Sequence, residues 1–156
     1  MTKLNVEIEF EGRATQLELS EPSLEKLIQA AHQFAETENI FIFEKDKDEE
    51  LHNIGGRGAI SIVIHQCKQV TVHLNFDHKT ETETFPPSAT VFRILRWAIG
   101  KKVFNLDDTA RAKANLILPG QDSPLPRDHS ISKYVTVNNC GLALELTLRD
   151  FTNGHR

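Results

Sequence analysis

The sequence predicts an α+β protein that contains two copies of one small unit. Polar and apolar residues alternate in several short stretches, which is the pattern of half-buried strands. Two other stretches carry apolar residues at helical spacing. The order hairpin, helix, strand, loop, strand occurs twice along the chain. This repetition indicates two tandem domains.

The first domain is predicted to cover residues 1–68. Ser23 can cap its helix, and the charged residues 44–50 are expected to form a solvated excursion. Gly55-Gly56-Arg57-Gly58 is interpreted as a turn, because the Gly-Lys-Ser/Thr of a phosphate-binding loop does not follow. A hairpin, a helix and two strands are expected in this order, at 4–19, 24–35, 40–43 and 60–64.

The second domain is predicted to cover residues 69–148, directly after a connection without flexible composition. Its helix is expected to begin after Thr90 and to end at Gly100. Phe92 and Trp97 lie on the two margins of its apolar stripe. They either widen the core face, which we favour, or one of them packs across the domain junction. A hairpin, a helix and two strands are expected at 70–85, 91–99, 116–118 and 142–148.

The composition excludes several classes of protein. The net charge of −4 gives no general attraction to nucleic acid or to acidic membranes. No apolar run approaches the roughly 20 residues that span a bilayer. The two cysteines are too few for a disulfide framework. We therefore expect a cytoplasmic protein that binds neither nucleic acid nor a membrane.

No group of residues points to an active site. His65 and Cys67 share a strand face and could ligate a metal, but no second pair at ligand spacing accompanies them, so a structural role is favoured. Cys140 has no base beside it in any motif and is interpreted as a loop thiol. We expect no catalytic residue, no cofactor and no metal, and thus no enzyme.

Several short motifs in the second domain resemble ubiquitin. Pro87-Ser88-Ala89-Thr90-Val91 resembles the entry to the ubiquitin helix, and Leu116-Ile117-Leu118-Pro119-Gly120 is similar to a strand with its following turn. Ile131-Ser132-Lys133-Tyr134 resembles the loop whose tyrosine hydroxyl ties down neighbouring backbone. The alternating leucines at 142–146 match the last strand. These motifs agree in order and spacing over 69–154, whereas the first domain shares only the pattern.

The resemblance implies both a fold and a function. The fold would be two tandem ubiquitin-like β-grasp domains followed by a flexible C-terminal tail at 149–156. Such a chain resembles the interferon-induced two-domain ubiquitin-like modifier and its bacterial counterparts from antiphage operons. The first domain has the length of a single unit, and the chain extends only briefly past a glycine. Both features favour the bacterial version. The protein would then act in antiviral defence as a tag joined to its targets by an isopeptide bond.

The tail would supply the group that is conjugated. Glycine has no Cβ and fits narrow enzyme channels, and Gly154 is the only glycine after the last strand. By resemblance, its carboxylate is the group that is activated with ATP. A peptidase must first cut between Gly154 and His155. The enzymes would recognise the residues that lead to this site, namely Arg149, Asp150, Phe151, Thr152 and Asn153.

The chain also departs from ubiquitin at positions that face partners. Asn153 replaces the first residue of a glycine pair, and Asp150 stands in a stretch that is basic in ubiquitin. Ala143 and Glu145 replace part of the hydrophobic contact patch, so that Ile117 is its main remnant. A dedicated enzyme set is therefore expected. It would comprise a ubiquitin-activating-like enzyme, a conjugating-like enzyme and a JAB-type deconjugating peptidase, besides the protein targets.

Two other functions stay open at this point. A non-covalent interaction module would use the two β-grasp domains to present sheet surfaces, and its tail would be incidental. A sulfur carrier that ends in a thiocarboxylate would share the adenylation step. Such carriers are usually single domains ending in two glycines, so this function ranks last.

Overall fold

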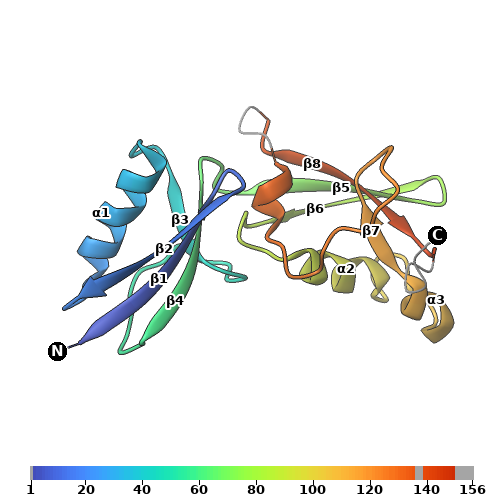
Figure 1. Ribbon diagram of the computed structural model, residues 1–156. Helices are drawn as coiled ribbons and strands as arrows, with labels where there is room; N and C mark the ends of the chain where they lie inside the picture. The colour runs from blue at the N-terminus through green and yellow to red at the C-terminus, as the bar shows by residue number, and fades with distance from the viewer. Residues whose placement is uncertain (1, 136–138, 150–156) are drawn as a thin grey trace.

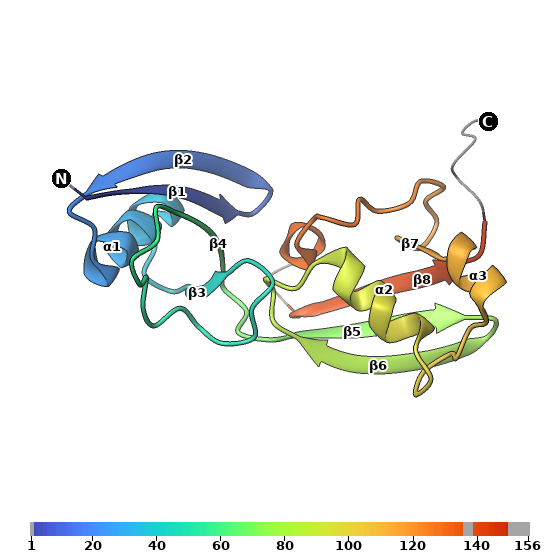
Figure 2. The ribbon, with the colours of Figure 1, turned by 90° about the horizontal axis from the view of Figure 1, so that it is seen from below.

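The computed structural model describes residues 2–135 and 139–149 and consists of two similar units that lie side by side (Figures 1 and 2). Each unit packs a helix on one face of a four-stranded sheet. The strand order is β2-β1-β4-β3 in the first sheet and β6-β5-β8-β7 in the second. In both, the central pair is parallel and the outer pairs are antiparallel. This confirms the predicted fold class of two tandem β-grasp domains.

The first domain forms where its alternating and helical patterns predict it. Its helix begins after Ser23, whose Oγ accepts the amide of Lys26 at 3.1 Å. The core lies between this helix and the alternating apolar side chains of the central strands. The elements are β1 (Lys3–Phe10), β2 (Arg13–Ser20), α1 (Leu24–Ala35), β3 (Phe41–Glu44) and β4 (Ala59–His65).

The second domain repeats this plan with additions between its helix and its last strands. Thr90 caps α2 as predicted, since its Oγ1 accepts the amide of Arg93 at 3.2 Å, and Gly100 follows the helix as its C-cap. The elements are β5 (Val70–Phe76), β6 (Lys79–Phe85), α2 (Val91–Ile99), α3 (Asp108–Lys113), β7 (Asn115–Ile117), the 3-10 helix η1 (Ile131–Tyr134) and β8 (Gly141–Thr147).

The short helix α3 was not predicted from the sequence. It is capped by Asp107, whose Oδ1 accepts the amide of Ala110 at 2.8 Å. None of its residues is buried, so no apolar stripe announces it. The available signal was the pair Asp107 and Asp108, because aspartate is favoured both as an N-cap and in the first turn.

The two aromatic residues on the margins of α2 behave differently. Trp97 is half-buried and packs edge-on against Phe85 with ring centroids 5.5 Å apart, which confirms that it widens the core face. The same prediction is wrong for Phe92, which is 44% exposed. Phe92 lies on the solvent side of α2, where Arg96 places its guanidinium 5.7 Å from the ring centroid.

Local contacts hold the long segment between β7 and β8. Ile131 in η1 is fully buried in the core of the second domain. The Ser132 amide donates to the Pro87 carbonyl at 3.1 Å and so ties η1 to the entry of α2. The Tyr134 hydroxyl lies 2.6 Å from Nδ1 of His129. The resemblance implied a contact with neighbouring backbone, so the tyrosine has a different partner here.

Candidate functional site

The direction of β8 decides where the chain leaves the second domain. β5 begins at the connection between the domains, and β8 pairs with it in parallel, with Thr71 opposite Gly141 and Asn75 opposite Glu145. β8 therefore starts at the domain junction and runs away from the first domain (Figure 1). Its carboxyl end lies at the far end of the second domain.

The structure describes one residue of the predicted tail, Arg149. Its Nη2 donates to the Asp122 carbonyl at 3.3 Å and lies 3.8 Å from Oδ1 of the same residue. The Asn115 side-chain amide donates to the Arg149 carbonyl at 3.4 Å. Arg149 is thus attached to the second domain. The other predicted tail residues lie outside the described part of the chain: Asp150, Phe151, Thr152, Asn153, Gly154, His155 and Arg156.

The three residues predicted as a partner surface do share one sheet face. Ile117 and Glu145 are directly opposite each other on β7 and β8, and Ala143 lies two residues before Glu145 on the same side of the strand. Ala143 is exposed and Glu145 half-buried, but the Ile117 side chain is only 7% exposed. Ile117 therefore offers little apolar surface to a partner.

The strand next to these residues makes the same face polar. His73 pairs with Ala143 and Asn75 pairs with Glu145 across the parallel ladder. On the other side, the hydroxyls of Thr82 and Thr80 contact the side chains of His73 and Asn75, at 3.4 Å and 2.5 Å respectively. This face of the second domain thus presents histidine, threonine and amide groups, in contrast to the hydrophobic patch of ubiquitin.

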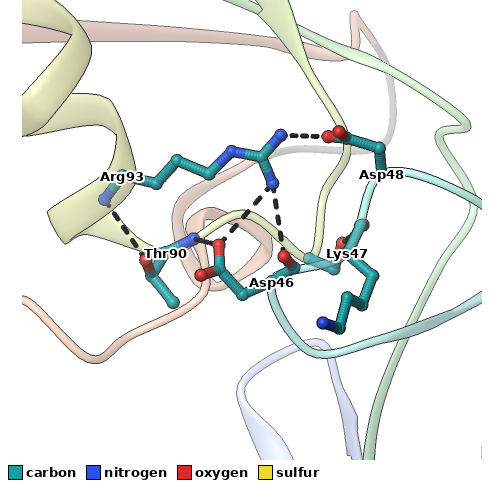
Figure 3. Close-up of polar contacts among 6 residues, drawn as sticks. Asp46, Lys47, Asp48, Thr90 and Arg93 are labelled. Carbon is teal, nitrogen blue, oxygen red and sulfur yellow. Dashed lines mark hydrogen bonds and ion pairs between the residues drawn. The ribbon is translucent and has the colours of Figure 1, made fainter.

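A polar cluster across the domain junction corrects the prediction for residues 44–50. Arg93 of α2 donates to the Asp46 carbonyl at 3.4 Å, lies 3.6 Å from the Asp46 carboxylate and also binds the Asp48 carboxylate (Figure 3). The Asp46 amide donates to the Ser88 carbonyl at 2.9 Å, and the Ser88 hydroxyl donates to the Lys47 carbonyl at 2.7 Å. Residues 46–50 are exposed as predicted, but the prediction missed that Asp46, Lys47 and Asp48 also contact the second domain.

A buried patch lies beside this cluster on the sheet face opposite α1. Glu9, Phe43, Val63 and His65 occupy neighbouring register positions on that face, and all four are buried although they lie outside the core around α1. Contacts from the second domain reach them, since Lys133 Nζ lies 3.9 Å from Glu9 Oε2. The second domain therefore covers the part of this sheet face around Glu9.

His65 has the structural role that was predicted. Its Nδ1 accepts the amide of Cys67 at 2.9 Å, and its ring also forms a hydrogen bond with the backbone of Val135 in the second domain. Burial lowers the pKa of His65 below its ordinary value, although the hydrogen bond to the Val135 backbone and the Glu11 carboxylate oppose this effect. The imidazole is thus held neutral at the junction.

The cysteine prediction is wrong, because Cys67 and Cys140 form a disulfide. The two residues are 73 positions apart, with Cα atoms 5.7 Å from each other. Sequence spacing alone did not reveal this pair. The pair depends on the fold, because β5 and β8 run parallel to each other. This pairing places Cys67, in the connection before β5, next to Cys140, the residue before β8.

The described residues suggest neither a metal site nor a membrane span. Within 2–135 and 139–149, no group of three His, Cys, Asp or Glu side chains could hold a metal ion. In the same part of the chain, no helix has the length and apolar character needed to cross a bilayer.

Comparison with protein families identifies the second domain. Residues 69–149 match the family described as BilA ubiquitin-like domain 2. In a comparison with curated proteins, no match was found. The family match begins just before β5, ends at Arg149 and covers more than half of the 156 residues. It supports the ubiquitin-like character predicted for this domain, and the chain accordingly belongs to the BilA ubiquitin-like domain 2 family.

Proposed function

We propose that this protein is a ubiquitin-like modifier that is made as a precursor, cleaved between Gly154 and His155, and conjugated through the Gly154 carboxylate to target proteins. The observation that carries this proposal is the direction of β8, which leaves the junction and ends at the far side of the second domain. The family match at 69–149 supports the ubiquitin-like part of it. The proposed setting is bacterial antiphage defence.

The proposed chemistry explains why a single glycine would end the mature chain. A carboxylate is a poor electrophile, so the Gly154 carboxylate attacks the α-phosphorus of ATP and pyrophosphate leaves. An enzyme thiolate then displaces AMP to form a thioester, and an amine of the target displaces the thiolate to form an amide. Each step takes place inside a narrow site, where the missing Cβ of glycine avoids collisions.

The position of Arg149 sets the reach of the tail. Its contacts with Asp122 and Asn115 attach the chain to the second domain up to this residue. Fully extended, residues 150–154 can span at most about 18 Å beyond that point. An activating enzyme would therefore have to bring its nucleotide close to the end of β8, and we expect it to contact the loop around Asp122.

The proposed partners follow from the same surfaces. We infer a dedicated activating-like enzyme, a conjugating-like enzyme and a JAB-type peptidase that read the tail and the polar face around Ala143 and Glu145. The domain boundaries that accompany this proposal are 1–68, 69–148 and 149–156, with conjugation in the cytoplasm. The protein itself would be a substrate of these enzymes and not an enzyme.

Intact mass spectrometry tests the proposal with three matched forms of the chain. The full chain should lose His155 and Arg156 when it is co-expressed with its peptidase. A chain that ends at Gly154 should need no peptidase and should form a thiol-sensitive adduct with the activating enzyme and ATP. The Gly154→Arg variant should give neither product. Unchanged mass in all three forms, or full biological activity of Gly154→Arg, would instead favour a non-covalent interaction module.

A further inference from the structure

We propose that Cys67 and Cys140 form a reversible thiol–disulfide site that locks the connection between the two domains and is opened by thiols that attack Cys140. The co-reactant is a low-molecular-weight thiol or a dithiol protein. This site is separate from the tail and does not depend on conjugation through Gly154. Its physical basis is the placement, the unequal burial and the neighbours of the two cysteine residues.

The backbone holds the two cysteines together independently of the sulfur–sulfur bond. The Thr71 amide donates to the Cys140 carbonyl at 2.9 Å, and Thr71 is also the register partner of Gly141. The Cα distance of 5.7 Å lies within the range of about 4.4–6.8 Å that disulfides require. Because strand pairing sets this distance, the reduced thiols stay within reach of each other. The bond can therefore form again after reduction.

The two cysteine residues are not equally exposed. Cys67 is 2% exposed, whereas Cys140 is half-buried at the start of β8. An external thiolate would thus attack Cys140 Sγ, forming a mixed disulfide there while the bond to Cys67 breaks. Cys67 leaves as a thiolate and takes up a proton. A second external thiol then releases Cys140, so that one disulfide and two thiols become two cysteine thiols and one external disulfide.

The neighbours of Cys67 explain what the bond controls. Cys67 lies in the connection 66–69, and its amide donates to His65, the last residue of β4. The His65 ring also bonds the backbone of Val135 in the second domain. The disulfide adds a covalent tie from the same connection to the beginning of β8. When the disulfide is reduced, only non-covalent contacts hold the connection 66–69 in place. Local unfolding of this connection should therefore become more frequent.

A reversible role fits this pair better than a permanent one. Disulfides in reducing compartments are mostly transient or redox-sensing, and we place the protein in such a compartment. The second domain also has its own buried hydrophobic core between its sheet and α2. The partial exposure of Cys140 also gives exchange a defined entry point.

Mass spectrometry after alkylation in glutathione buffers provides the first test, carried out on the full chain. Air-oxidised protein should take up no alkyl group, and protein in excess reduced glutathione should take up two. The Cys67→Ser variant should form a glutathione adduct at Cys140, whereas Cys140→Ser should react far more slowly at Cys67. The proposal fails if both cysteines are alkylated in oxidised protein, if the bond resists excess glutathione, or if the two single variants react equally.

Hydrogen exchange then tests the lock itself. Reduction should accelerate amide exchange at 66–71 and 139–141 by about tenfold or more, with no change in the buried amides of α1 and α2. The Cys67→Ser/Cys140→Ser variant should match the reduced protein and should not respond to reductant. Equal exchange in oxidised and reduced protein would overturn the proposed effect on the junction. A Gly154→Arg background gives the same readout, so failure here is distinct from failure of the conjugation proposal.

Discussion

Arg93 of α2 and Asp46 of the loop after β3 join the two domains, with the Arg93 guanidinium donating to the Asp46 carbonyl at 3.4 Å and lying 3.6 Å from its carboxylate. Asp48 accepts from the same guanidinium. One cation of the second domain therefore engages a carbonyl and two carboxylates of the first. Because the connection 66–69 is short, such a contact strongly restricts how the domains are oriented.

Replacing Arg93 with alanine should loosen the domains without unfolding them. The Asp48 side chain is 70% exposed, so the ion pair should contribute no more than about 1 kcal/mol and should weaken with salt. We expect wider inter-domain motion in Arg93→Ala by NMR relaxation or small-angle scattering. Arg96→Ala is the matched control, because Arg96 lies on the same helix and contacts the Phe92 ring instead. Equal effects of both variants would contradict the role given to Arg93.

A second prediction concerns the buried carboxylate of Glu9. Glu9 is 8% exposed, and Lys133 is the cation closest to it, at 3.9 Å. Lys133→Met should leave this carboxylate buried without an opposite charge and lower the free energy of unfolding by about 1–3 kcal/mol in urea. Adding Glu9→Gln removes the charge and should recover much of the loss. A double variant less stable than Lys133→Met would rule out this ion pair as the cause.

A third prediction is a loss of stability in mild acid. Burial lowers the pKa of His65 in the folded protein, whereas the unfolded chain has the ordinary value near 6.5. The unfolded state therefore binds the proton first, and stability falls as the pH drops below about 6.5 towards the folded pKa. Protonation also removes the lone pair with which Nδ1 accepts the Cys67 amide.

Unfolding curves at pH 7 and pH 5 check this effect. His65→Asn keeps a side-chain oxygen that can accept the Cys67 amide but cannot titrate in this range. The variant should lose the part of the pH dependence that belongs to His65. His52→Asn is the control, since His52 is exposed and its Nδ1 lies 3.4 Å from the carbonyl oxygen of Glu50. An unchanged pH dependence in His65→Asn would show that another group is responsible.

Local features of this fold were predictable from the sequence, whereas contacts between distant residues were not. Helix caps were predictable, because Ser23 and Thr90 act on amides three residues away. The positions of most strands in each domain followed from period-two alternation. In contrast, the contact of Arg93 with Asp48 joins residues 45 positions apart, and no periodic pattern marks either of them. The Cys67–Cys140 bond was missed for the same reason, because it depends on which strands become neighbours.

In the candidate site, too, only the local features were predictable from the sequence. The alternation of β8 correctly placed Ala143 and Glu145 on one face, and the register adds Ile117 to it. That alternation says which side of the sheet a residue faces, but it does not say what covers that side. Ile117 was therefore expected to be accessible, although it is 7% exposed. Burial on a polar sheet face depends on loops whose path the local sequence does not determine.

The last prediction uses two neighbouring residues of α2 to separate core from surface. Ile94 is fully buried, and Phe92 is 44% exposed on the same helix. Ile94→Ala removes buried apolar atoms and leaves a cavity, so it should lower the free energy of unfolding by about 2–5 kcal/mol. Phe92→Ala should change it by no more than about 1 kcal/mol, because the ring is largely exposed and loses mainly its exposed cation–π contact with Arg96. Urea unfolding of the oxidised full chain measures both. A large loss in Phe92→Ala would mean that this ring is covered in solution, for example by a second copy of the chain.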